Sequence, residues 1–168
     1  MEKALKRIQT GRLSLIMMIF FTVVNAIMWF FGSQYIFPYT AYTPQLTALF
    51  ARLLQVKYGF NGAVAFWLLI SLAIVGLYIY AWNKAKTNAK GFRLALILYV
   101  VDTLLFIITY SQALFQMNTV IAIGNNVLIL PEVAFAIGIH GLILYHFYTA
   151  YKESKLHPEA LIQPRMKR

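Results

Sequence analysis

Four long apolar runs alternate with polar segments along this chain of 168 residues. The runs cover residues 13–32, 62–82, 94–110 and 127–148. A helix of about 20 apolar residues, rising about 1.5 Å per residue, is long enough to cross a hydrocarbon layer of roughly 30 Å. The pattern predicts an all-α fold, a polytopic membrane four-helix bundle that with its connections forms a transmembrane domain over residues 1–152.

Residues 43–56 carry a different, amphipathic pattern. Thr43 followed by Pro44 is typical of a helix N-cap and a first-turn proline. Apolar residues recur at helical spacing, while Arg52 lies off that stripe; they are Leu46, Leu49, Phe50 and Leu53. We therefore predict an amphipathic helix lying in the outer membrane interface. A re-entrant segment and a fifth span are the alternatives.

The region before the last span contains several breaks. Residues 111–119 are uncharged and are predicted to form a loop, and the apolar stretch that follows is interrupted by Gly124-Asn125-Asn126 and by Pro131-Glu132. This stretch is too short for two full spans. It predicts an interfacial or re-entrant piece over residues 118–126, followed by the fourth span.

The composition excludes a soluble globular protein. Hydrophobic residues make up 61% of the chain and charged residues only 12%, about half the charged fraction of soluble domains. A basic start and Val24-Asn25-Ala26 loosely resemble a signal peptide and its cleavage site. Because bulky Ile27 and Met28 follow at once, we expect the first run to be retained as a span.

Basic residues lie between alternate spans. Of the 15 Lys and Arg residues, 13 fall before the first run, between the second and third runs, or after the fourth run. This positive-inside bias predicts a multi-pass protein of the cell membrane with both termini cytoplasmic. Residues 153–168 are expected to form a mobile basic tail near anionic lipid. The net charge of +10 is thereby explained without nucleic-acid binding.

Recognisable catalytic and metal-binding motifs are missing from the sequence. It contains no cysteine, which excludes disulfides and thiolate chemistry. His140 and His146 are six residues apart, unlike a chelating pair at i and i+4. We therefore expect no metal, no cofactor and no soluble-type catalytic site.

Arg12-Leu13-Ser14-Leu15, Asn25 and the aromatic segment after Gly32 resemble small uncharacterised four-helix integral membrane proteins of Gram-positive bacteria. The resemblance extends over most of the chain. It implies the fold class and supplies no activity.

Each span contributes a polar residue near its middle: Asn25, Ser71, Asp102 and His140. Unpaired polar groups are costly in lipid, so this polar midplane layer is expected to face the bundle interior. Asp102 and His140 should share a depth and form a hydrogen bond. Thr22, Asn25 and Trp29 lie on one face of the first span, which suggests that this face points inward.

The polar layer has two interpretations. Interhelical hydrogen bonding is the favoured one, and under it Asp102→Asn should be mild. A proton-exchanging or ligand-binding site is the other. Glu132, with Asn125 and Asn126 before it, marks a candidate outer cavity that His140 would also line.

The sequence thus predicts a non-catalytic accessory or binding subunit of unknown biochemical activity, in contact with the lipid bilayer. It would form a homo-oligomer or join a larger membrane complex. A small proton-coupled or solute transporter acting as an oligomer is the alternative, and an intramembrane enzyme is the third hypothesis.

Overall fold

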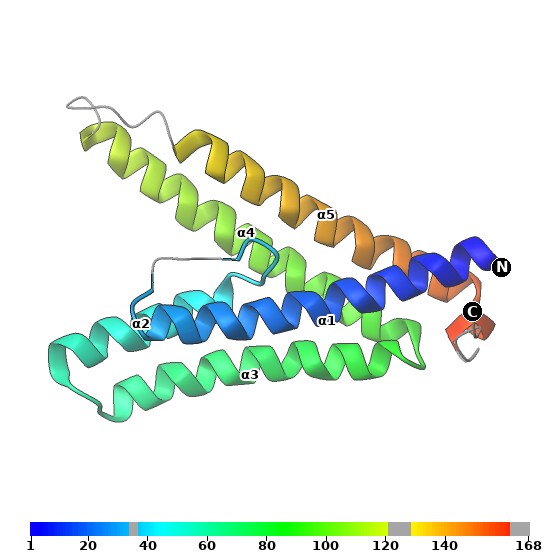
Figure 1. Ribbon diagram of the computed structural model, residues 1–168, viewed down its shortest axis with the longest axis horizontal. Helices are drawn as coiled ribbons and strands as arrows, with labels where there is room; N and C mark the ends of the chain where they lie inside the picture. The colour runs from blue at the N-terminus through cyan, green and yellow to red at the C-terminus, as the bar shows by residue number, and fades with distance from the viewer. Residues whose placement is uncertain (34–36, 121–128, 162–168) are drawn as a thin grey trace.

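Helices form all of the regular structure in the described residues. The structure, a computed structural model, describes the backbone of residues 1–33, 37–120 and 129–161, and their side chains except 110, 112–120 and 129–133. In chain order the elements are α1 (Glu2–Phe30), α2 (Thr43–Tyr58), α3 (Gly62–Ala85), α4 (Ala89–Val120), α5 (Ile129–Leu156) and a 3₁₀ helix, η2 (Pro158–Leu161) (Figure 1). The all-α prediction is confirmed.

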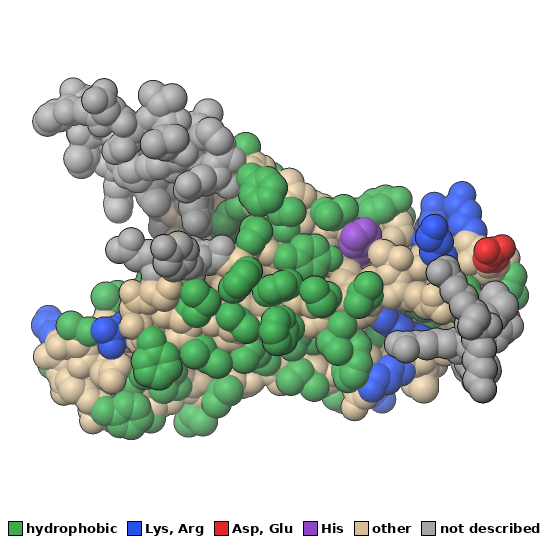
Figure 2. Space-filling model, in the orientation of Figure 1, with side chains coloured by type: hydrophobic (Ala, Val, Ile, Leu, Met, Phe, Trp, Pro, Cys, Tyr) green, Lys and Arg blue, Asp and Glu red, His purple; other side chains and the backbone are tan. Residues whose placement is uncertain are grey.

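Three described helices are long and apolar enough to cross a membrane. They are α1, α3 and the Ala89–Thr109 part of α4. Large apolar side chains such as Phe20, Leu69 and Leu104 are more than half exposed on them. Apolar side chains spread over the middle of the visible face in Figure 2, with Lys and Arg mostly at its ends. Such a surface fits a membrane protein, because lipid can cover it.

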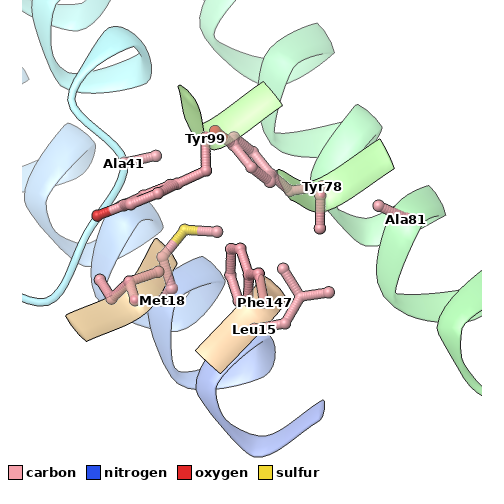
Figure 3. Packing of buried hydrophobic residues seen from close by; sticks show 9 residues of the cluster. Leu15, Met18, Ala41, Tyr78, Ala81, Tyr99 and Phe147 are labelled. Carbon is pink, nitrogen blue, oxygen red and sulfur yellow. The ribbon is translucent and has the colours of Figure 1, made fainter. Parts of the chain in front are cut away.

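One buried core joins α1, α3, α4 and α5. Its side chains include Leu15 and Met18 from α1, Tyr78 from α3, Tyr99 from α4 and Phe147 from α5 (Figure 3). Tyr78, Tyr99 and Phe147 are among the largest fully buried side chains. The aromatic rings fill the space between these four helices. In Figure 1, α1 lies beside α5, and α3 is a neighbour of α4.

The helices extend beyond the apolar runs. The predicted loop over residues 111–119 is wrong, because α4 continues to Val120 through a segment without Gly or Pro and with helix-favouring Gln, Ala and Leu. The expectation of a mobile tail is also wrong for its first part. Residues 153–156 continue α5, and η2 buries Ala160 and Leu161 in a small cluster with Ile8 and Phe92.

Arg12 ties three elements together at one end of the bundle. Its guanidinium donates to the carbonyl oxygens of Ala85 (3.1 Å), Lys86 (2.7 Å) and Leu161 (3.2 Å). These include carbonyls at the end of α3 that have no partner within the helix. The N-terminal part of α1, the turn between α3 and α4, and η2 therefore lie together.

Gly11 allows α1 and α5 to approach closely. A Cβ atom added at Gly11 would overlap the Cβ of Ala150 and lie 3.1 Å from Phe92 Cε1. We expect Gly11→Val to lower the free energy of unfolding by about 1–3 kcal/mol through overpacking. Thermal unfolding in detergent would measure the loss. Gly138→Val is the matched control, since a Cβ there meets nothing within 4 Å; equal losses in both variants would contradict this account.

Candidate functional site

The chain turns back into the bundle after α1. Residues 37–42 are not helical, yet Thr40 and Ala41 are buried among the helices. In Figure 1 this segment lies near the middle of the bundle, where α2 begins. We call residues 37–45 the return segment.

Helix α2 then runs outward again beside the first half of α3. Ser71 Oγ donates to the carbonyl oxygen of Pro44 at the start of α2 (2.9 Å), and the rings of Phe50 and Trp67 lie 5.2 Å apart further along. These two contacts show that α2 and α3 are antiparallel. The pair is closed by a tight turn at Gly59, whose φ of 70° favours glycine.

The position of α2 differs from the predicted interfacial helix. The helix itself is present, and its apolar side chains Phe50 and Leu53 are exposed as expected for a lipid-facing stripe. However, its first turn is buried in the bundle, with Pro44, Gln45 and Thr47 inaccessible. The re-entrant alternative fits this geometry, because the small residues Ala48 and Ala51 let α2 pack into the bundle.

Polar side chains of the surrounding helices bond the non-helical backbone of the return segment. Asn25 makes two such bonds with Phe37, accepting from its N–H (2.9 Å) and donating to its carbonyl (2.8 Å). Thr22 Oγ1 accepts from the N–H of Ala41 (2.8 Å), and the Tyr99 hydroxyl donates to the Thr40 carbonyl (3.0 Å). Buried backbone groups need such partners wherever secondary structure cannot supply them.

Asp102 caps α2. Its Oδ2 accepts from the Tyr42 N–H (2.7 Å), and its Oδ1 accepts from the Thr43 N–H (2.7 Å) and the Thr43 hydroxyl (2.6 Å). The side chain comes from α4 and is only 2% exposed. A carboxylate at a helix N-terminus satisfies N–H groups left free by the helix and interacts favourably with its dipole.

His140 belongs to the same buried region but does not bond Asp102. Its Nδ1 lies 2.9 Å from the Ala136 carbonyl oxygen of its own helix, and its ring stacks on Phe106 at 4.5 Å and on Tyr99 at 5.4 Å. The predicted hydrogen bond between Asp102 and His140 is therefore wrong. The Asp102 carboxylate instead accepts hydrogen bonds from the N–H groups at the start of α2.

A small cavity lies against His140. It has a volume of about 60 Å³, and its walls come from α1, the return segment, α4 and α5. Two buried nitrogen atoms on lining residues, Trp29 Nε1 and His140 Nε2, have no hydrogen-bond partner among the described residues. Since Nδ1 must carry a proton to donate to the Ala136 carbonyl, Nε2 of the neutral imidazole is an acceptor, and Trp29 Nε1 is a donor. This volume is enough for a few water molecules.

A second polar cluster escaped the sequence analysis. Ser14 Oγ bonds the Tyr39 hydroxyl, and His146 Nδ1 lies 3.4 Å from Ser14 Oγ and 3.5 Å from the Tyr39 hydroxyl. It joins α1, the return segment and α5. Thr22 had a sequence signal, because it shares a helical face with Asn25; nothing in the pattern pointed to Tyr39 or Tyr99.

The four predicted midplane residues are all buried, and three of them bond the return segment: Asn25, Ser71 and Asp102. Asn125 and Asn126 lie outside the described residues, as does the side chain of Glu132, so the outer cavity stays a prediction. These side chains hold the return segment, whose residues 37–42 are not helical, inside the helical bundle. No model of a known protein family, no curated protein and no solved structure matches this chain.

Proposed function

We propose that the protein is a multi-pass membrane protein in which α1, α3, α4 and α5 all cross the bilayer. The fourth helix supports this, because α5 has 28 residues and buries Ile143 and Phe147 in the same core as the three apolar helices. Its exposed side chains include Phe135 and Leu142. Basic residues gather at one end of the bundle. They come from the start of α1, the turn between α3 and α4, and the end of α5. We propose that this end is cytoplasmic.

Reporter fusions test this topology. A reporter fused after Gly32 is expected on the outside, and one fused after Asn88 on the cytoplasmic side, because one span separates each basic segment from the opposite end. Paired alkaline phosphatase and fluorescent protein fusions would measure both sides. The same side for both positions would contradict the four-span topology.

We infer that this protein is a non-catalytic accessory or binding subunit, and that its buried acid serves structure. The observation that carries this inference is the set of three donors on the Asp102 carboxylate, all supplied by Tyr42 and Thr43. The oxygen atoms of this carboxylate already accept hydrogen bonds from the protein itself. Non-helical backbone inside a membrane requires such partners.

Two measurements on purified protein test the inference. Gentle solubilisation and co-purification should recover a larger assembly, either a homo-oligomer or a complex with another membrane protein. Proteoliposomes containing the protein should show no proton flux above that of empty vesicles. Proton flux that Asp102→Asn abolishes without loss of folding would overturn the structural role of Asp102.

A small proton-coupled or solute transporter is the second candidate, and the cavity beside His140 favours it. The cavity offers one donor, Trp29 Nε1, and one acceptor, His140 Nε2, to whatever fills it. Transporters commonly place their sites where a discontinuous helix begins inside the membrane. Solute uptake that His140→Phe abolishes while the protein stays folded would favour this candidate over the accessory role.

A further inference from the structure

A basic pocket lies at the end of the bundle where η2 packs. It has a volume of about 470 Å³ and is formed by the start of α4, the last turns of α5, and η2. Three cationic side chains line it: Lys90 and Arg93 from α4, and Lys155 from α5. All three are exposed. The wall also includes Asn88 and Tyr151.

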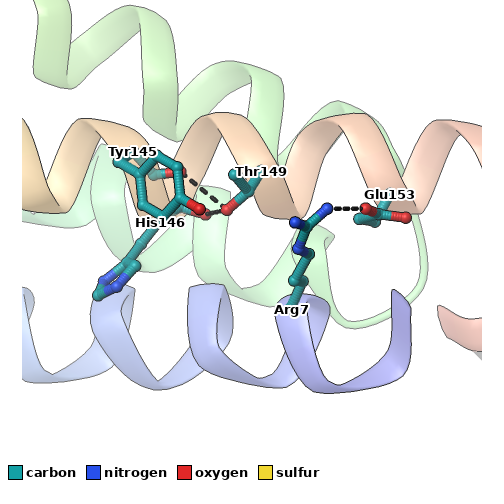
Figure 4. Close-up of polar contacts among 5 residues, drawn as sticks. All are labelled: Arg7, Tyr145, His146, Thr149 and Glu153. Carbon is teal, nitrogen blue, oxygen red and sulfur yellow. Dashed lines mark hydrogen bonds and ion pairs between the residues drawn. The ribbon is translucent and has the colours of Figure 1, made fainter. Parts of the chain in front are cut away.

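The positive charge of this pocket is not neutralised by nearby acids. No Asp or Glu lines the pocket, and no ion pair involves Lys90, Arg93 or Lys155 within the part of the chain that the structure describes. The two acids nearest along the chain already have partners. Glu153 pairs with Arg7 (Figure 4), and Glu159 lies 3.3 Å from His157 Nδ1. The hydrogen bond from Arg7 lowers the pKa of Glu153, so this carboxyl stays ionised and engaged.

The chemistry of the pocket fits a phosphate group. The planar guanidinium of Arg93 can donate two parallel hydrogen bonds to phosphate oxygens, and the two lysines add point charges. Helix α4 begins at the pocket, so the positive end of its dipole adds to the same field. One of its first N–H groups, that of Lys90, already donates to Asn88 Oδ1 (2.8 Å). The side-chain cations therefore carry most of the attraction.

The position of the pocket points to lipid as the source of that phosphate. Trp82 and Tyr151 lie near this end, as expected for aromatic residues at a membrane surface, and Lys86 Nζ lies 3.7 Å from the centre of the Trp82 ring. Basic pockets between membrane helices on the cytoplasmic side are suited to anionic headgroups. This step rests on the proposed cytoplasmic placement of this end.

We propose that the pocket formed by Lys90, Arg93 and Lys155 binds the phosphodiester headgroup of an anionic glycerophospholipid in the inner leaflet. The apolar flanks of α4 and α5 would receive the acyl chains. The bound lipid would neutralise the repulsion among the three cations and join the ends of these two helices.

Native mass spectrometry in a neutral detergent tests the proposal, with phosphatidylglycerol and phosphatidylcholine as probes. We expect phosphatidylglycerol to bind at least tenfold more tightly than phosphatidylcholine. The triple variant Lys90→Gln, Arg93→Gln, Lys155→Gln should lose at least tenfold of this affinity, since each cation near a headgroup contributes about fivefold. Gln keeps the polarity of these exposed positions, and circular dichroism would verify that the variant is folded.

A matched triple variant, Lys3→Gln, Lys6→Gln, Lys57→Gln, removes the same charge away from the pocket and should retain phosphatidylglycerol binding. Equal loss in both triple variants would show diffuse attraction and overturn the site. Absence of any preference for phosphatidylglycerol would also overturn it. Displacement of the lipid by millimolar inorganic phosphate would assign the pocket to a free anion and overturn the lipid assignment. Binding in detergent does not depend on topology, so these failures are distinct from those of the reporter fusions.

Discussion

Asp102→Leu is expected to lower the free energy of unfolding by roughly 3 kcal/mol or more, because it leaves three partly buried donors at the start of α2 without their acceptor. Asp102→Asn should lose about 1–3 kcal/mol. The amide oxygen of Asn can still accept hydrogen bonds from Thr43. Its NH₂ group, a donor, would face the N–H of Tyr42, which is also a donor. The sequence analysis predicted a mild effect for Asp102→Asn, whereas the structure predicts a measurable loss of stability.

Equilibrium unfolding in mixed detergent micelles would measure the Asp102 series. His140→Phe is the control, since phenylalanine can keep the stacking with Tyr99 and Phe106 and gives up only the bond from His140 Nδ1 to the Ala136 carbonyl of its own helix. Its loss should stay below about 1.5 kcal/mol. An Asp102→Leu variant as stable as the native protein would show that the cap is dispensable.

Asn25→Asp should destabilise the bundle by about 2 kcal/mol, although it changes a single atom of the side chain. The amide NH₂ that donates to the Phe37 carbonyl would become an oxygen that faces that carbonyl. The bond from the Phe37 N–H would survive, because the other side-chain oxygen can still accept it. The change removes this hydrogen bond to the return segment and places a carboxyl group at a fully buried position.

Asn83→Asp is the matched control for Asn25→Asp. Asn83 is exposed near the end of α3, and its side-chain oxygen accepts only from Lys86 Nζ in the described hydrogen bonds. Its substitution should change stability by less than about 0.5 kcal/mol. If thermal unfolding shows equal losses for both variants, the return segment is not held by Asn25.

Hydrophobic patterning was sufficient to predict the apolar helices and the burial of Asn25, Ser71, Asp102 and His140. These predictions rest on local properties: run length, and the cost of exposing a polar group to lipid. The helical stretch over residues 111–119 was missed because its uncharged polar residues resemble a loop in hydropathy. Its helix-favouring composition without Gly or Pro was the better guide.

The partners of the buried polar residues could not be predicted in this way. The prediction from the sequence paired Asp102 with His140, because both lie in neighbouring predicted spans at the same depth. It gave no sign that residues 37–45 enter the bundle and present their N–H groups to Asp102 first. Backbone donors leave no mark in a residue pattern, so a side chain that binds backbone looks unpaired until the fold is known.

The central claim is that α2 begins inside the bundle and runs outward, and the depth of its exposed face tests this most directly. Single cysteines at Leu46, Phe50, Leu53 and Lys57 can each carry a spin label, because the chain contains no cysteine of its own. Electron paramagnetic resonance with oxygen and a water-soluble nickel chelate reports the depth of each label in the bilayer. A re-entrant α2 predicts a steady rise toward the surface of about 16 Å from Leu46 to Lys57, at about 1.5 Å per residue. The same depth at all four positions would mean that α2 lies flat in the interface, and would contradict the account.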